Sequence, residues 1–129
     1  MLNHTNKSKL GVFGEEIAIK YLIKNGYKIL ARNYLLKADE IDIIAKQGDG
    51  TLVFCEAKTM MGFQDPAKGL MPEDNITAFK YKKMARAAQT FANKYPGYIN
   101  EEKGWRMDLI AIVLDEQNNV ADLRHYENV

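Results

Sequence analysis

Residues 40–59 read EIDIIAKQGDGTLVFCEAKT, and the pattern in this stretch decides the fold that the sequence predicts. Two runs rich in β-forming residues, 40–46 and 51–59, stand on either side of the segment QGDG at 47–50. Glycine and aspartate in a short segment between two such runs are a strong turn signal. The stretch therefore predicts a β-hairpin.

Side chains alternate between the two faces of a strand, which sorts the charged residues of the hairpin onto one face. Glu40 and Asp42 share that face on the first strand. Glu56 and Lys58 share it with Phe54 on the second strand. The pattern also fits a hairpin with one face open to solvent. The opposite face carries apolar residues that can pack into a core: Ile41, Ile43, Val53, Cys55 and Ala57.

The register of the hairpin decides which charged side chains meet. If the turn is centred on Asp49, then Asp42 faces Glu56, and Glu40 faces Lys58. Opposed Cβ atoms lie roughly 4.5–5.5 Å apart, so the two carboxylates must share a proton, splay apart into water or share a cation. Mg²⁺ or Mn²⁺ suits oxygen ligands at this spacing, whereas histidine and cysteine are too scarce for a typical zinc site.

Two alternatives to a metal site stay open on the sequence. The hairpin could be exposed, with Glu40 and Lys58 forming an ordinary cross-strand ion pair. A slip of one residue in the register would also put the two carboxylates on opposite faces.

The rest of the chain predicts two helices and three more strands around this hairpin. A helix is expected over Lys9–Lys24, before Asn25-Gly26, and a second over 75–95, before Pro96-Gly97. The other strands are expected at 27–34, 105–114 and 120–126, the last as an edge strand, with a loop over 60–74. The order α-β-β-β-α-β-β predicts an α/β fold with a central mixed β-sheet flanked by helices.

Helical spacing also predicts which side of each helix is buried. The apolar side of the first helix consists of Leu10, Phe13, Gly14, Ile17, Ala18, Tyr21 and Leu22. That of the second helix consists of Thr77, Tyr81, Met84, Ala88, Phe91 and Ala92. Lys80 lies at the border of this side, where it can turn toward the sheet. The polar side carries a basic stripe, which suits a nucleic-acid backbone or a solvated surface equally: Lys82, Lys83, Arg86 and Lys94.

Length and composition are typical of one domain. The chain has 129 residues, 47% of them hydrophobic, which predicts a single domain over 1–129 with a flexible polar tail at 1–8. No apolar run is long enough for a membrane span, and the start lacks a signal-peptide core. The only cysteine, Cys55, cannot form an internal disulfide, which fits the cytoplasm.

The net charge of +1 hides an uneven distribution. Residues 39–56 hold five acidic residues and one lysine, and residues 75–94 hold five basic residues and no acidic one. An acidic centre beside a basic segment suits metal-assisted chemistry on phosphates, although two unrelated solvated faces would look the same.

Several segments, in this order, carry a family resemblance: GVFGE at 11–15, GY at 26–27 with RNY at 32–34, DEIDII at 39–44, and VFCEAKT at 53–59. They resemble the YraN family (UPF0102), small bacterial proteins regarded as endonucleases, over residues 10–114. That family is similar to the PD-(D/E)XK nucleases and to archaeal Holliday-junction resolvases. The resemblance implies a restriction-endonuclease-like fold.

The resemblance also implies roles for individual residues. Asp42 and Glu56 match the metal ligands, Lys58 matches the catalytic lysine, and Glu15 matches a glutamate on the first helix. Three further positions match with less defined roles: Glu40, Lys80 and Asp108, the last as a structural carboxylate. Two positions depart from the family pattern and bear on substrate binding, because Asp39 replaces a usual glycine and Met60 a common arginine.

The expected function is therefore that of a Mg²⁺- or Mn²⁺-dependent endonuclease acting on DNA, branched DNA among its substrates. Lys58 would orient a metal-activated water or neutralise charge on the phosphate. No base-reading motif is visible, so recognition is expected to be of backbone or shape. The alternatives are a non-catalytic nucleic-acid-binding module and a small phosphoesterase, the latter disfavoured because no glycine-rich phosphate loop is present. A homodimer is expected only by analogy with the resolvases.

The remaining histidines and aromatic residues are predicted to have no catalytic role. His4 and His125 have no partner at metal-ligand spacing and are predicted to be incidental. Trp105 and the tyrosines are expected to pack rather than to stack on bases, with Tyr34 and Phe79 as the two to check for stacking.

Overall fold

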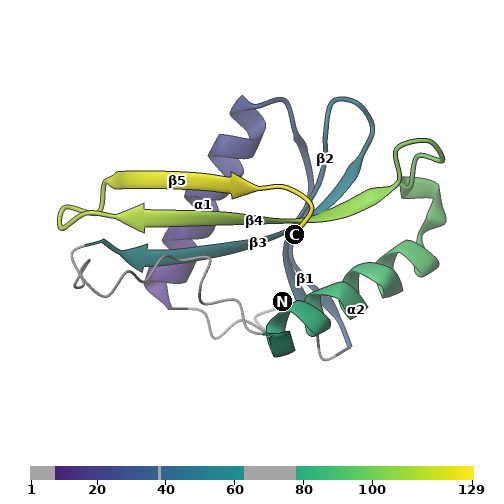
Figure 1. Ribbon diagram of the computed structural model, residues 1–129, viewed down its shortest axis with the longest axis horizontal. Helices are drawn as coiled ribbons and strands as arrows, with labels where there is room; N and C mark the ends of the chain where they lie inside the picture. Colours follow the sequence, from purple (N-terminus) through teal and green to yellow (C-terminus); the bar gives the residue numbers. More distant parts are fainter. Residues whose placement is uncertain (1–7, 38, 63–77) are drawn as a thin grey trace.

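The computed structural model describes residues 8–37, 39–62 and 78–129, and only the backbone of residues 78 and 79. Its helices and strands follow the predicted order (Figure 1). They are α1 (Lys9–Lys24), β1 (Lys28–Leu36), β2 (Asp39–Lys46), β3 (Leu52–Met61), α2 (Ala78–Lys94), the 3₁₀ turn η3 (Pro96–Tyr98), β4 (Trp105–Leu114) and β5 (Val120–Tyr126).

The predicted bounds of α1, β4 and β5 are confirmed, and those of β1, β2 and β3 are within two residues of the prediction. Met60 and Met61 extend β3 rather than beginning a loop. The rest of the predicted loop, from 63, and the expected helix start at 75–77 lie outside the described residues. So does most of the expected tail, but Ser8 caps α1, because its hydroxyl accepts a hydrogen bond from the Gly11 amide.

The five strands form one mixed sheet in the order β1-β2-β3-β4-β5. The neighbours β3 and β4 are parallel, which requires the long connection that contains α2, and all other neighbours are antiparallel. Along β3, Val53 and Cys55 belong to the core beneath α1, whereas Leu52 and Phe54 belong to the core beneath α2. The two helices therefore cover opposite faces of the sheet, as the α/β prediction requires.

The β2–β3 hairpin has the predicted register. Its ladder extends as far as the pair Ile43 and Cys55, and one further step in this register sets Asp42 against Glu56. The β2–β3 ladder ends before that step. There the Asp42 carboxylate accepts a hydrogen bond of 3.0 Å from the backbone amide of Ala57. The Asp42 carboxylate thus accepts the hydrogen bond that a backbone carbonyl of β2 would accept if the ladder continued. This hydrogen bond fixes the orientation of the Asp42 side chain.

Both faces of the hairpin are covered, so the alternative of a solvent-exposed hairpin is wrong for the two central carboxylates. Asp42 is 5% exposed and Glu56 is 8% exposed. One predicted face also needs correction, because Ile41 packs beneath α2 with Ile44, not beneath α1 with Ile43. At Ile41 the strand β2 has left the β3 ladder and is paired with β1 alone, so the alternation seen further along β2 does not extend to it.

The buried side of α1 is rotated relative to the predicted one. Phe13 is 42% exposed, whereas Glu15 and Ile19 are buried. The reason is the close approach of α1 to β3 at Gly14, where an added Cβ would lie only 1.7 Å from the Thr59 Oγ1 atom. Only glycine permits this approach, and the approach turns the neighbouring Glu15 inward.

The buried side of α2 is largely as predicted. Met84, Ala88, Phe91 and Ala92 are buried, but Tyr81 is 41% exposed, so its predicted burial is wrong. Its hydroxyl donates a hydrogen bond to the carbonyl of the last residue, 3.3 Å away. In the described parts of the chain, no helix combines the length and the hydrophobicity that a membrane crossing requires.

Candidate functional site

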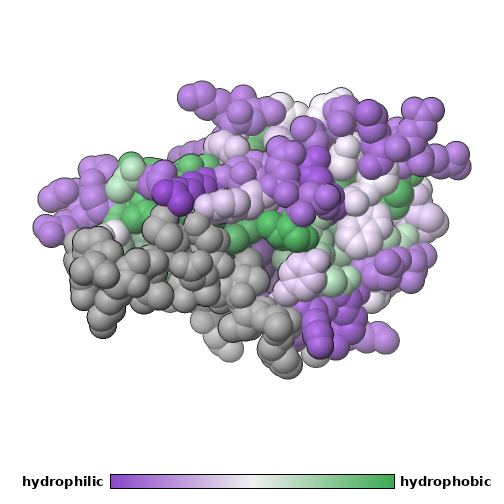
Figure 2. All heavy atoms as spheres, in the orientation of Figure 1, coloured by the Kyte–Doolittle hydropathy of each residue, from purple (hydrophilic) through white to green (hydrophobic). Residues whose placement is uncertain are grey.

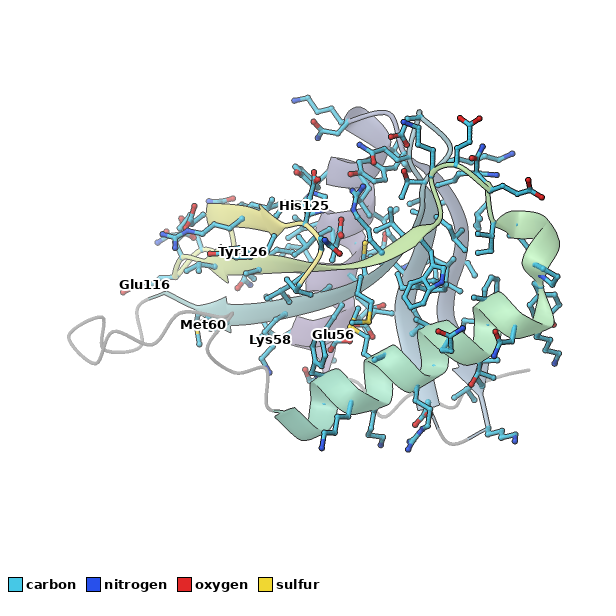
Figure 3. The ribbon with its side chains drawn as sticks, turned by 45° about the vertical axis from the view of Figure 1, so that its right-hand side comes forward. Glu56, Lys58, Met60, Glu116, His125 and Tyr126 are labelled. Atoms are coloured by element: carbon cyan, nitrogen blue, oxygen red, sulfur yellow. The ribbon has the colours of Figure 1, made fainter. Side chains whose placement is uncertain are left out.

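The residues predicted to form a site converge on one cleft of about 430 Å³. It lies where the start of α1 and the first turns of α2 meet β2 and β3. Figure 3 shows Glu56 and Lys58 projecting from β3 toward the start of α2. The lining includes seven residues singled out from the sequence: Glu15, Glu40, Asp42, Glu56, Lys58, Lys80 and Lys83.

Asp42 and Glu56 form a buried pair of carboxylates at the base of this cleft. Burial, and then the negative charge of Asp42, raises the pKa of Glu56 to about 7. Lys80 opposes that increase in pKa, since its Nζ lies 2.7 Å from Glu56 Oε2. Asp42 and Glu56 are therefore two buried carboxylates, one of which already pairs with the ammonium group of Lys80 on α2. Such a pair of oxygen donors suits a cation.

The donor set fits a hard, partly hydrated ion better than a fully enclosed one. Among the described residues, no three side chains of the His, Cys, Asp and Glu types converge as a complete metal cage. Mg²⁺ usually keeps several waters and uses one or two carboxylates together with substrate phosphates. The pair Asp42 and Glu56 therefore fits Mg²⁺ or Mn²⁺, and it does not fit a four-ligand zinc site.

The two adjacent glutamates of α1, which the sequence pattern does not separate, have different surroundings. Glu15 is 2% exposed and lines the cleft. Glu16 lies on the outside and forms an ion pair with Arg32 of β1. Glu15 is therefore the helix glutamate that can act on the contents of the cleft.

Lys58 stands two residues after Glu56 on β3, and so on the same face. It is partly exposed and lines the cleft. Within residues 8–37, 39–62 and 78–129, its side chain has no hydrogen bond or ion pair. The predicted Glu40–Lys58 cross-strand pair is therefore not formed, and the Lys58 side chain lines the cleft beside Glu56.

Asp108 lies outside the cleft, beneath α1 on the opposite face of the sheet. Its fully buried carboxylate accepts hydrogen bonds from Arg106 Nε at 2.9 Å and from the Asn128 amide at 3.0 Å, and its Oδ2 lies 2.7 Å from His125 Nε2. Burial alone would raise the pKa of Asp108, but these partners outweigh burial and hold that pKa below its usual range. Such a carboxylate stabilises the sheet and cannot reach the cleft.

The prediction that His125 is incidental is wrong. Its ring is 8% exposed and joins two elements, since Nδ1 lies 2.9 Å from the Tyr21 hydroxyl on α1 while Nε2 contacts Asp108 on β4. No local pattern could reveal this role, because Tyr21 is 104 residues away in the chain. His4 lies outside the described residues.

Some basic residues of α2 line the cleft, and others lie on the outer surface of the helix. Figure 2 shows this outer surface as largely hydrophilic. Lys80 and Lys83 line the cleft, and Lys82 is exposed. Arg86 donates two hydrogen bonds of 2.8 Å to Asp39 at the start of β2, and they hold the pKa of Asp39 below its usual range. Asp39, which stands where the family usually has glycine, therefore links α2 to the sheet through its ion pair with Arg86.

Comparison with known proteins identifies relatives across nearly the whole chain. The model of the uncharacterised protein family UPF0102 matches residues 14–112. A UPF0102 protein of Caldicellulosiruptor saccharolyticus is 36% identical over 123 residues, which cover 95% of this chain and 98% of the relative. Another, from Chlorobium phaeobacteroides strain BS1, is 40% identical over 110 residues, or 85% of this chain and 81% of the relative.

Among solved structures, a repair endonuclease from Pyrococcus abyssi matches 88% of this chain with a TM-score of 0.44 and 13% sequence identity. This chain covers 40% of that larger protein. A similarity this distant assigns no role to any residue.

Proposed function

This chain belongs to the uncharacterised family UPF0102, and we propose that it is a metal-dependent endonuclease that hydrolyses phosphodiester bonds in DNA, including branched DNA. One observation carries the proposal: Asp42 and Glu56 are buried side by side in a cleft that also holds Lys58. Two like charges buried together destabilise a fold. A divalent cation bound between them would offset that cost, as the Lys80 ammonium 2.7 Å from Glu56 does in part without it.

Asp42 and Glu56 are the residues that would hold Mg²⁺ or Mn²⁺. When bound, the ion would polarise a phosphate oxygen and lower the pKa of a water molecule. Asp42 is already oriented by the amide of Ala57, and Glu56 would exchange the ammonium of Lys80 for the ion. Both carboxylates project from strands of the central sheet, which limits their movement.

Lys58 would orient the attacking water or neutralise the charge that develops on the phosphate. Glu15 would accept a hydrogen bond from a water in the cleft or hold a second ion. Glu40 adds a further acidic side chain to the lining of the cleft.

The substrate would lie along α2, where Lys82 and Lys83 can contact phosphates and Arg86 is exposed beside Asp39. Contacts of this kind read the backbone and shape of DNA and not its sequence. The proposed homodimer rests on the analogy with resolvases alone.

Metal removal tests this proposal. The protein is incubated with linear duplex, single-stranded and branched DNA and with RNA, in Mg²⁺, in Mn²⁺ or in EDTA, and products are separated by gel electrophoresis. We expect DNA cleavage with either metal and none in EDTA, because the two carboxylates alone cannot activate water. Salt-sensitive binding without cleavage of any substrate would instead identify a non-catalytic binding module. Phosphate release from mononucleotides in a parallel reaction, without cleavage of any nucleic acid, would identify a phosphoesterase.

A further inference from the structure

A second hollow lies at the far end of α2 from the cleft. It measures about 210 Å³ and is bounded by β1, the end of α2 and η3. Phe91 is buried within it, whereas Tyr98 on η3 is 46% exposed. Four aromatic side chains line what we call the aromatic pocket: Tyr34, Phe91, Tyr95 and Tyr98.

The rings of the aromatic pocket surround Phe91. Its centroid lies 5.5 Å from that of Tyr34, 5.0 Å from that of Tyr95 and 5.9 Å from that of Tyr98. The Tyr34 hydroxyl donates a hydrogen bond of 3.3 Å to the Tyr95 hydroxyl, which sets two polar atoms among the rings. Aromatic faces with a few polar atoms beside them suit a planar heterocycle, which stacks through its face and forms hydrogen bonds through its edge.

The two longest elements around the aromatic pocket are basic. Five lysine or arginine residues and no acidic residue lie in α2, where Lys80 is paired with Glu56 and Arg86 with Asp39. The strand β1 adds Lys28 and also Arg32, which is paired with Glu16 of α1 on the opposite face of the sheet. Lys94 Nζ lies 5.4 Å from the centroid of the Tyr95 ring, at the pocket itself. A lysine beside a cluster of partly exposed aromatic rings suits single-stranded nucleic acid, because a phosphate pairs with the cation while a base stacks on a ring. An acidic peptide would match the charge but offers no flat heterocycle to pack against the aromatic rings.

The helix α2 connects the aromatic pocket with the cleft. Lys80 lines the cleft and Tyr95 lines the pocket, and a helical path between them is roughly 22 Å long at 1.5 Å per residue. Lys83 and Arg86 lie along that path. At the rise of about 3.4 Å per nucleotide that a stacked strand has, six or seven nucleotides would cover it, and a more extended single strand would cover it with fewer.

We propose that the aromatic pocket binds an unpaired nucleobase of the DNA whose backbone enters the cleft. This inference rests on the proposed function and deepens it, because it names the substrate class. The substrate is DNA with a single-stranded segment that begins no more than about six nucleotides from the scissile phosphate.

Binding is measured by fluorescence anisotropy in EDTA, so that no cleavage occurs. One probe is a forked DNA, a duplex with ten-nucleotide single strands at one end. The second probe is the same fork with abasic sugars throughout its single strands. We expect the wild-type protein to bind the base-bearing fork about tenfold more tightly, as the loss of one stacked base predicts. Tyr98→Ala should remove most of this preference and leave the affinity for the abasic fork unchanged.

Phe13→Ala serves as the matched control, because Phe13 is similarly exposed, at 42%, and lines neither the cleft nor the pocket. It should retain the full preference. Equal wild-type affinity for the two forks, or a preference that survives Tyr98→Ala, would overturn the pocket assignment. If metal-dependent cleavage persists in that case, the proposed function stands without the pocket. If neither fork binds, the pocket assignment is wrong, and the cleavage assay with metal tests the proposed function separately.

Discussion

Replacing Glu56 with glutamine is expected to lower the rate of metal-dependent DNA cleavage by about a thousandfold or more, which is roughly 4 kcal/mol of transition-state stabilisation. Glutamine keeps the shape of the side chain but loses the charge that would hold the ion opposite Asp42. The fold is expected to survive, because burial already raises the pKa of Glu56 to about 7 and makes its ionised form costly. Initial rates at saturating Mg²⁺ measure the effect, and urea unfolding verifies the fold.

The matched control is Glu16→Gln, which removes a neighbouring carboxylate that lies outside the cleft and pairs with Arg32. It should cleave at nearly the wild-type rate. A folded Glu56→Gln protein that retains more than about a tenth of the wild-type rate would show that this carboxylate is not a metal ligand in the reaction.

Replacing Asp108 with asparagine is expected to reduce the free energy of unfolding by about 3–5 kcal/mol, because it leaves the mostly buried Arg106 guanidinium without its closest counter-charge. The substitution also weakens the contact with His125, which links β4 and β5 to α1. Urea unfolding at pH 7 measures the loss. For comparison, Asp122→Asn breaks the exposed pair with Arg124 and should cost less than about 1 kcal/mol.

The stability that Asp108 contributes should also depend on pH with a definite sign. The folded protein holds the pKa of Asp108 below its usual value, so the unfolded chain binds the proton more readily. The contribution is therefore present above the unfolded pKa of about 3.9 and is lost as the pH falls through the lower folded pKa. The stability difference between wild type and Asp108→Asn should narrow below about pH 4. A difference that stays constant through that range would mean that Asp108 is not held ionised.

The sequence predicts the part of the site that depends on contacts between residues close together in the chain. The alternation of residues 40–59 and the turn at Asp49 determine the register, so the meeting of Asp42 with Glu56 follows from residues near each other in the chain. The burial of that pair does not follow, because it depends on how the two helices cover the sheet. The inward turn of Glu15 depends likewise on the contact between Gly14 and Thr59.

The features that the sequence does not predict are long-range. His125 acquires its role from Tyr21 and Asp108, and Asp39 acquires its role from Arg86, which stands 47 residues later. The aromatic pocket brings residues of β1 together with residues more than fifty positions away, although Tyr34 is one of the two aromatic residues that the sequence singles out for stacking. The other, Phe79, has no described side chain.

The measurement that tests the central claim most directly is the binding of Mn²⁺ in the absence of DNA, followed by electron paramagnetic resonance of the free ion. The claim is that Asp42 and Glu56 together hold a divalent ion. Wild-type protein and Glu16→Gln should bind Mn²⁺ with the same affinity, whereas Asp42→Asn and Glu56→Gln should each bind it at least about tenfold more weakly, because a carboxylate ligand is lost. Undetectable binding by the wild type, or wild-type affinity in the Asp42→Asn and Glu56→Gln proteins, would contradict the claim.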